Sequence, residues 1–252
     1  MESKEPAKPL PIETVFEWSD KIPVRRLVFQ DAKWSLSSRQ KKIDAAVELK
    51  HALIINRGQQ IRLNANLPRL SARVGEASPL VLSSFLSLEL NPRTLEIQEL
   101  RARRGDISLG LRGLVEDIAN LPVKPHLRLN ADAQLSLDQI ANDLKAFKPE
   151  LELPPLSGSV NAETDVVLTG TTNFQSSIRV RTQQVQVENF KIGDAQLQGT
   201  LTQDALEIQK IDIAHPAGLV ELNGARLEFR QPYAVRALVK TDAFDLQALF
   251  KS

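Results

Sequence analysis

The chain has 252 residues and a formal net charge of +1, from 32 basic and 31 acidic side chains. This balance gives no support to nucleic-acid binding through bulk charge, and we expect no nucleic-acid partner. The absence of cysteine excludes a disulfide framework, a thiolate metal site and a cysteine nucleophile. A chain of this length can form one large all-β domain or two small ones.

The first segment is charged and proline-rich, with Pro6, Pro9 and Pro11. It has no signal-peptide pattern, and no run in the chain approaches the ~20 apolar residues that span a bilayer. We expect residues 1–11 to be a linker or a boundary segment of a longer protein, with any membrane anchor outside this chain.

From residue 12 onwards, apolar and polar residues alternate through most of the chain, as in half-buried antiparallel strands. The pattern predicts a hairpin of Val24–Phe29 and Ala32–Leu36 with its turn at Gln30–Asp31. Two further strands flank an Arg57-Gly58 turn, and the run Leu80–Leu90 fits either one strand or two. In total we expect about fifteen to twenty strands of ordinary length.

One segment has a helical pattern instead. Ser136 followed by Gln139 forms a capping box, and apolar residues recur at spacings of three and four up to Phe147. Lys148-Pro149 ends this segment. We expect a short amphipathic helix that covers one end of a sheet, and a further helical turn at Leu246–Phe250. The polar face of the first helix is not basic, which argues against a membrane-surface helix.

The proline-rich segment Leu151–Leu156 is the expected joint between two β units. We expect the first unit to cover residues 12–150 and to end in the helix. The second unit is expected to cover residues 151–252.

The second unit repeats a cassette of the first. Leu95-Glu96-Ile97-Gln98 is identical to Leu206-Glu207-Ile208-Gln209, 111 positions later, and the same offset pairs Gly113 with Gly224. The shared order of strand, turn, strand, glycine and proline turn predicts an internal repeat. The alternative is that a meander of similar strands resembles itself by chance.

The apolar residues of the two cassettes form the candidate site. A period of two places alternate residues on one face of a strand, with Glu96, Glu207, Glu221 and Glu228 on the other. We expect the apolar positions to line a continuous groove that holds acyl chains. They are Leu95, Ile97, Leu109, Leu111, Leu206, Ile208, Val220, Leu222, Leu227 and Phe229.

The segment Phe190–Leu201, followed by Leu206–Ile208 and Leu219–Gly224, resembles the AsmA-like family of envelope proteins, including its TamB-type members. The resemblance consists of small residues, alternation and a recurring glycine, and it is densest from Gly158 to Phe250. Members of this family normally carry an N-terminal transmembrane helix, which this sequence does not contain.

The resemblance implies an all-β, mainly antiparallel fold, an elongated curled sheet that forms an apolar groove. It implies a periplasmic protein held at the inner membrane by a segment outside this chain. Phospholipids are the implied ligands, carried between the inner and outer membranes, and an outer-membrane barrel protein is a further implied partner. The residues fit this mechanism because a one-sided apolar sheet must bury that face, while aromatic residues that fill sandwich cores are only 5% of the chain.

Enzymatic activity is not expected. The sequence has no nucleophile elbow, phosphate-binding loop or zinc-protease helix. His51, His126 and His215 are far apart and lack metal-ligand spacing. We therefore expect no catalytic residue, metal or cofactor.

Two alternatives to a lipid groove are left open. One is a structural or assembly module that acts through exposed sheet edges in outer-membrane protein biogenesis. The other is a closed β-sandwich without a groove. A small basic cluster at Arg101, Arg103 and Arg104 is expected to be a solvated turn.

Overall fold

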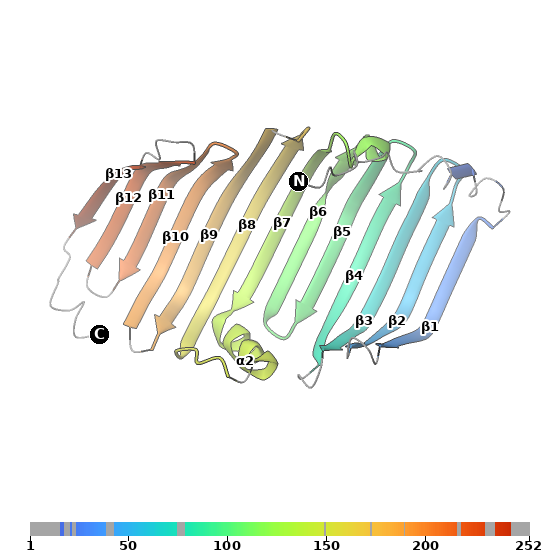
Figure 1. Ribbon diagram of the computed structural model, residues 1–252, viewed down its shortest axis with the longest axis horizontal. Coiled ribbons are helices and arrows are strands. Elements are labelled where there is room, and N and C mark those ends of the chain that lie inside the picture. Colours follow the sequence, from blue (N-terminus) through green and yellow to red (C-terminus); the bar gives the residue numbers. More distant parts are fainter. Residues whose placement is uncertain are drawn as a thin grey trace, which may run out of the picture. The chain divides into compact units, whose positions relative to one another are not determined.

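The computed structural model describes residues 16–17, 21, 24–38, 43–74, 79–148, 150–171, 173–188, 190–215, 218–229 and 235–242. Most of these residues form one antiparallel sheet, and one α-helix is described along its whole length (Figure 1). The prediction of an all-β fold with one short amphipathic helix is confirmed. Residues 1–11 and the helical turn expected at Leu246–Phe250 lie outside the described residues.

Thirteen strands follow one another across the sheet in chain order, from β1 to β13. Every neighbouring pair with a defined register is antiparallel. The strands are fewer than expected because they run for 8 to 15 residues, longer than the usual five or six. Their bounds are β1 Arg26–Ser38, β2 Ile43–Asn56, β3 Ile61–Val74, β4 Leu80–Leu90, β5 Thr94–Arg104, β6 Ile107–Glu116, β7 His126–Ser136, β8 Leu156–Thr169, β9 Asn173–Val187, β10 Phe190–Thr202, β11 Ala205–His215, β12 Gly218–Glu228 and β13 Val235–Asp242.

The expected hairpin around Gln30–Asp31 is wrong. Arg26–Ser38 is a single strand, and it pairs with β2 along its whole length, from Ile55 to Ile43. Asp31 has a φ of 49°, a left-handed conformation that Asp adopts more easily than most residues. The strand absorbs this irregularity without reversing direction. The run Leu80–Leu90 is likewise one strand, β4.

The α-helix, α2 (Leu137–Phe147), begins where the capping box predicts. The Ser136 hydroxyl accepts a hydrogen bond from Gln139 N at 3.3 Å. The Gln139 side chain also reaches the β5–β6 turn, where its Oε1 accepts a hydrogen bond from Asp106 N at 2.9 Å. The helix therefore lies at the strand ends, as expected (Figure 1). A single 3₁₀ turn, η1 (Ile118–Asn120), lies between β6 and β7.

The chain divides into two compact units. The first comprises residues 1–104, 110–130 and 166–173, and the second comprises residues 105–109, 131–165 and 174–252. Register is defined for β1–β5 in the first unit and for β9–β13 in the second. The expected boundary between residues 150 and 151 stays a prediction.

The described residues form very little closed core. Their buried apolar side chains are mostly small, and no large side chain is less than 2% exposed. In the first unit, Leu49, Ala52 and Ala65 form a small cluster on one face of the sheet. No second sheet lies over the first in the described part of the chain, so a closed sandwich is not its fold.

Candidate functional site

In the first unit, the register gathers apolar side chains on one face of β1–β5. Residues that are paired across antiparallel strands share a face. Leu88 pairs with Ile97, and Leu90 pairs with Leu95, so both predicted positions of β5 lie on this face. Two rows of paired residues cross the unit: Leu27, Ile54, Leu63, Leu88 and Ile97, and then Phe29, Ala52, Ala65, Leu86 and Leu100.

The opposite face of the first unit carries charge. Arg62 Nη2 lies 2.7 Å from Glu89 Oε2, and Arg73 Nη2 lies 2.6 Å from Asp44 Oδ2. Hydrogen bonds from Arg62, and then from Gln60, hold the pKa of Glu89 below its usual value. Glu96 pairs directly with Glu89 and therefore lies on this polar face.

In the second unit, the register gathers a comparable apolar face on β9–β12. Leu206 pairs with Leu227, Ile213 with Val220, and Ile211 with Leu222. These pairs place five of the predicted positions, Ile208 included, on one face. Two rows cross the unit: Ile178, Gly199, Ile208 and Ala225, and then Val180, Leu197, Ile211 and Leu222.

The opposite face of the second unit is again charged. Arg226 Nη1 lies 2.6 Å from Glu207 Oε1, and its Nε lies 3.2 Å from Glu228 Oε1. Lys210 Nζ lies 2.5 Å from Asp212 Oδ2, and the hydrogen bond to Asp212 raises the pKa of Lys210. Glu221 pairs with Asp212. Carboxylates and cations thus neutralise one another away from the apolar face, both within a strand and between β11 and β12.

Three further predicted positions, Leu109, Leu111 and Phe229, lie outside the strand pairs whose register is defined in the described part of the chain. Arg112 Nη2 lies 3.7 Å from Glu99 Oε1 on the polar face of the first unit, so Leu111 beside it points to the apolar face. Leu109 belongs to the second unit and is 47% exposed. Phe229 follows the last residue of β12 and is also exposed. A groove that joins the two sets of residues stays a prediction.

The repeated tetrapeptides share an irregularity that supports the internal repeat. Ile97 pairs with Leu88 and Glu99 pairs with Ser87, which makes Gln98 the extra residue of a β-bulge. The equivalent shift in the second unit makes Gln209 the extra residue, because Gly199 pairs with Ile208 and Gln198 with Lys210. Each copy therefore puts its leucine and isoleucine on an apolar face and ends in a bulge.

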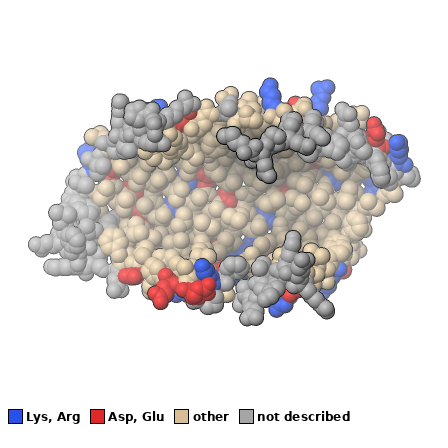
Figure 2. All heavy atoms as spheres, viewed as in Figure 1, with Lys and Arg blue, Asp and Glu red and all other residues tan. Residues whose placement is uncertain are grey.

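Large side chains on these faces are left in contact with solvent. In β1, Trp34 is 53% exposed and Leu36 is 69% exposed. On the face shown in Figure 2, Lys, Arg, Asp and Glu are sparse over the middle of the strands and lie mainly along the strand ends. Such a surface can bind apolar ligands.

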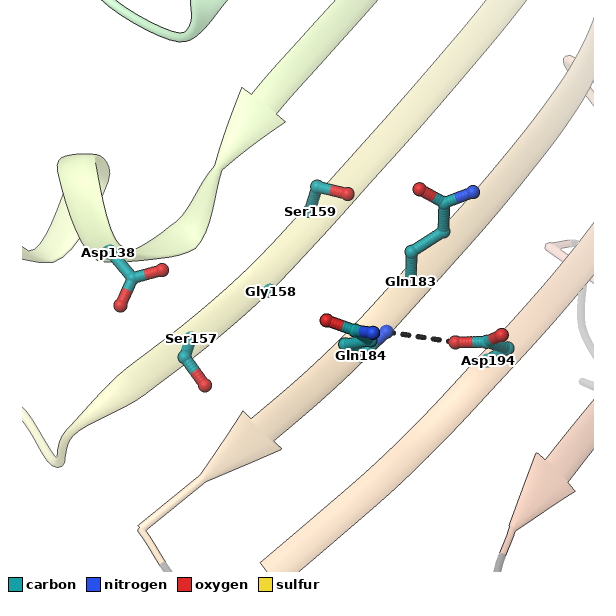
Figure 3. Close-up of a pocket in the computed structure, with 7 residues that line it drawn as sticks. All are labelled: Asp138, Ser157, Gly158, Ser159, Gln183, Gln184 and Asp194. Carbon is teal, nitrogen blue, oxygen red and sulfur yellow. Dashed lines mark hydrogen bonds between the residues drawn. The ribbon is translucent and has the colours of Figure 1, made fainter.

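A polar recess in the second unit was not predicted from the sequence (Figure 3). It is an open pocket of about 650 Å³ between α2 and the ends of β8, β9 and β10. Asp194 Oδ1 accepts a hydrogen bond from Gln184 N at 2.9 Å, and Gln184 has a φ of 52°. A Cβ at Gly158 would lie 2.7 Å from Gln184 O, so this glycine lets β8 approach the bulged backbone of β9. The recess is lined by Asp138, Ser157, Gly158, Ser159, Gln183, Gln184 and Asp194.

The basic cluster of the first cassette is not a turn. Arg101, Arg103 and Arg104 all lie within β5, which ends at Arg104. Arg101 Nε lies 2.6 Å from Glu99 Oε1. Among the described residues, no group of three or more His, Asp or Glu side chains is placed to hold a metal ion.

Comparisons with known protein families, curated proteins and solved structures find no significant match to this chain. Within the described ranges, no helix is long and apolar enough to cross a membrane. The site must therefore be interpreted from its geometry.

Proposed function

We propose that this chain binds the acyl chains of phospholipids on the apolar face of its sheet and passes lipid between the inner and outer membranes. In this proposal it is part of a periplasmic, AsmA-like protein that a segment outside this chain anchors in the inner membrane. The observation that carries the proposal is the apolar face itself, which no second layer covers in the described part of the chain.

The energetics favour an acyl chain as the occupant of this face. Each lipid methylene that leaves water contributes about 0.8 kcal/mol. Most residues of the rows in both units are aliphatic, as in the row Val180, Leu197, Ile211 and Leu222. Neighbouring positions on such a surface bind a methylene with similar free energy, so lipid can move without entering a deep site.

Lipid analysis of the purified protein tests this function. The full chain, purified from Gram-negative cells without detergent, is expected to carry phospholipid that mass spectrometry detects after extraction. Lipid-free protein is then expected to take up fluorescent phospholipid from one set of vesicles and deliver it to another. Protein that emerges lipid-free and takes up none from vesicles would contradict the proposal.

A structural or assembly role is the second candidate, and the strand order favours it. β1 and β13 are the terminal strands of the sheet, and an edge strand can accept a strand from another chain. Lipid-free protein that associates in a concentration-dependent manner through β1 would support this second role instead.

A further inference from the structure

Three exposed cations lie along one edge of the first unit. In an antiparallel meander, alternate turns lie at the same edge, here the β2–β3, β4–β5 and β6–β7 connections (Figure 1). They carry Arg57, Arg93 and Lys124, all exposed. Ile118 N donates a hydrogen bond to Arg93 O at 3.2 Å, which ties the second connection to the third. Connections two strands apart are separated by roughly 9–10 Å along this edge.

None of these cations forms an ion pair within 4.0 Å among the described residues, although Arg57 lies close enough to Glu89 to help lower the pKa of that carboxyl. The carboxylates of the same edge have partners of their own. Glu89 forms its ion pair with Arg62 at 2.7 Å. Glu116 Oε2 lies 3.2 Å from His126 Nε2, and Asp117 accepts a hydrogen bond from Asn120 Nδ2 at 3.0 Å. Arg57, Arg93 and Lys124 are therefore outside the ion pairs of this edge, while Asp117, whose partner is an uncharged amide, keeps its negative charge there.

The apolar face beside this edge determines which anion can approach. A charged headgroup cannot lie on rows of aliphatic side chains without a large loss of hydration. A lipid whose acyl chains lie along the strands must place its headgroup at the strand ends. Guanidinium and ammonium groups bind phosphate oxygens through charge-assisted hydrogen bonds.

We propose that Arg57, Arg93 and Lys124 form a basic rim that binds the phosphate groups of anionic phospholipids whose acyl chains lie on the adjoining apolar face. This inference rests on the proposed function and adds a headgroup preference to it.

A charge-matched pair of variants isolates the rim. The rim variant combines Arg57→Gln, Arg93→Gln and Lys124→Gln. The control variant combines Lys50→Gln, Arg69→Gln and Arg128→Gln, which are also exposed but lie within strands of the same unit. Each variant removes three positive charges, so bulk electrostatics change equally. Circular dichroism checks that both variants fold.

Calorimetric titration with two short-chain lipids measures the preference. The lipids share their acyl chains; one is a phosphatidylglycerol and the other a diacylglycerol without phosphate. The unmodified protein is expected to bind the phosphatidylglycerol more tightly. The rim variant is expected to lose roughly tenfold in affinity for it, with diacylglycerol binding unchanged, and the control variant is expected to match the unmodified protein. High salt should abolish the preference, because exposed charges are screened.

The possible outcomes distinguish headgroup binding by the basic rim from acyl-chain binding by the apolar face. If both lipids bind but the rim variant keeps the preference, or if both variants lose it equally, the rim is wrong and lipid binding stands. If inorganic phosphate alone binds the unmodified protein and this binding is lost in the rim variant, the rim is a free-phosphate site. If neither lipid binds the unmodified protein, the proposed function fails, and the rim inference fails with it.

Discussion

At the scale of single residues, the face on which a side chain lies determines the effect of a substitution. Leu222 pairs with Ile211 on the apolar face of β12. We expect Leu222→Asp to keep the strand signal in circular dichroism, because this face is not a closed protein core. We also expect it to reduce photo-crosslinking of lipid to a probe at Ile208, since a carboxylate among lipid tails costs several kcal/mol.

Asn223→Asp is the matched control for this prediction. Asn223 is the next residue of the strand and pairs with Lys210 on the polar face, so its variant should leave the labelling at Ile208 unchanged. Unfolding of Leu222→Asp, or no labelling at Ile208 in the unmodified protein, would count against an acyl-chain site.

The polar face makes a pH-dependent contribution to stability. Arg62 and Gln60 lower the pKa of Glu89 in the folded protein. The side chain of Glu89 is 15% exposed. Because this pKa is lower in the folded than in the unfolded protein, the ionised carboxylate stabilises the fold at pH values above the ordinary carboxyl pKa. This contribution is lost as the pH falls through the lowered pKa. We expect Glu89→Gln to reduce the free energy of unfolding at pH ~7 and to flatten its decline below pH ~4.5.

Urea unfolding at several pH values measures this effect. The same substitution at Glu163, 3.9 Å from Arg179 and 65% exposed, serves as a control and should change the stability little. Parallel pH profiles for the unmodified protein and Glu89→Gln would show that the Arg62–Glu89 pair contributes nothing.

At the scale of the strands, close backbone approach restricts the pairing of β6 with β7. A Cβ on Gly113 would lie 2.2 Å from Arg128 O and 2.7 Å from Leu129 Cδ2. We expect Gly113→Ala to reduce the free energy of unfolding by ~3 kcal/mol, because the backbone of β7 must move. Gly170→Ala is the comparison, since Gly170 has a φ of 69° and open space around it.

The left-handed backbone alone should cost Gly170→Ala only ~1 kcal/mol. Urea denaturation of the two variants measures the difference, and equal losses would show that β7 accommodates the extra methyl group. Gly224, which the repeat aligns with Gly113, also has open space around it, with a φ of 68°. The two aligned positions therefore need glycine for different physical reasons.

At the scale of the whole molecule, the described strands form one sheet, and each of the two units has an apolar face and little closed core. The stability of the sheet must come from the hydrogen bonds between strands, from ion pairs on the polar face and from burial of apolar side chains by a ligand or a partner. An ordinary domain buries its apolar face against a second layer of its own chain. The proposed function assigns that role to lipid.

Local patterns in the sequence determined which segments form strands and where α2 lies. Alternation with a period of two predicts strands and their faces, because successive side chains of a strand point to opposite sides. The same holds for α2, whose start depends on a cap only four residues long, from Ser136 to Gln139. The apolar positions Leu206, Ile208 and Leu222 could therefore be named before their register was known.

Only the tertiary structure decided register, bulges and the gathering of residues at the sheet edges. A left-handed Asp can begin a turn or sit inside a strand, and pairing with β2 along its whole length makes Asp31 part of β1. Arg57, Arg93 and Lys124 are far apart in the sequence and meet at one edge only because the strands form a meander. Register and strand order depend on hydrogen bonds between distant segments, which local sequence patterns do not encode.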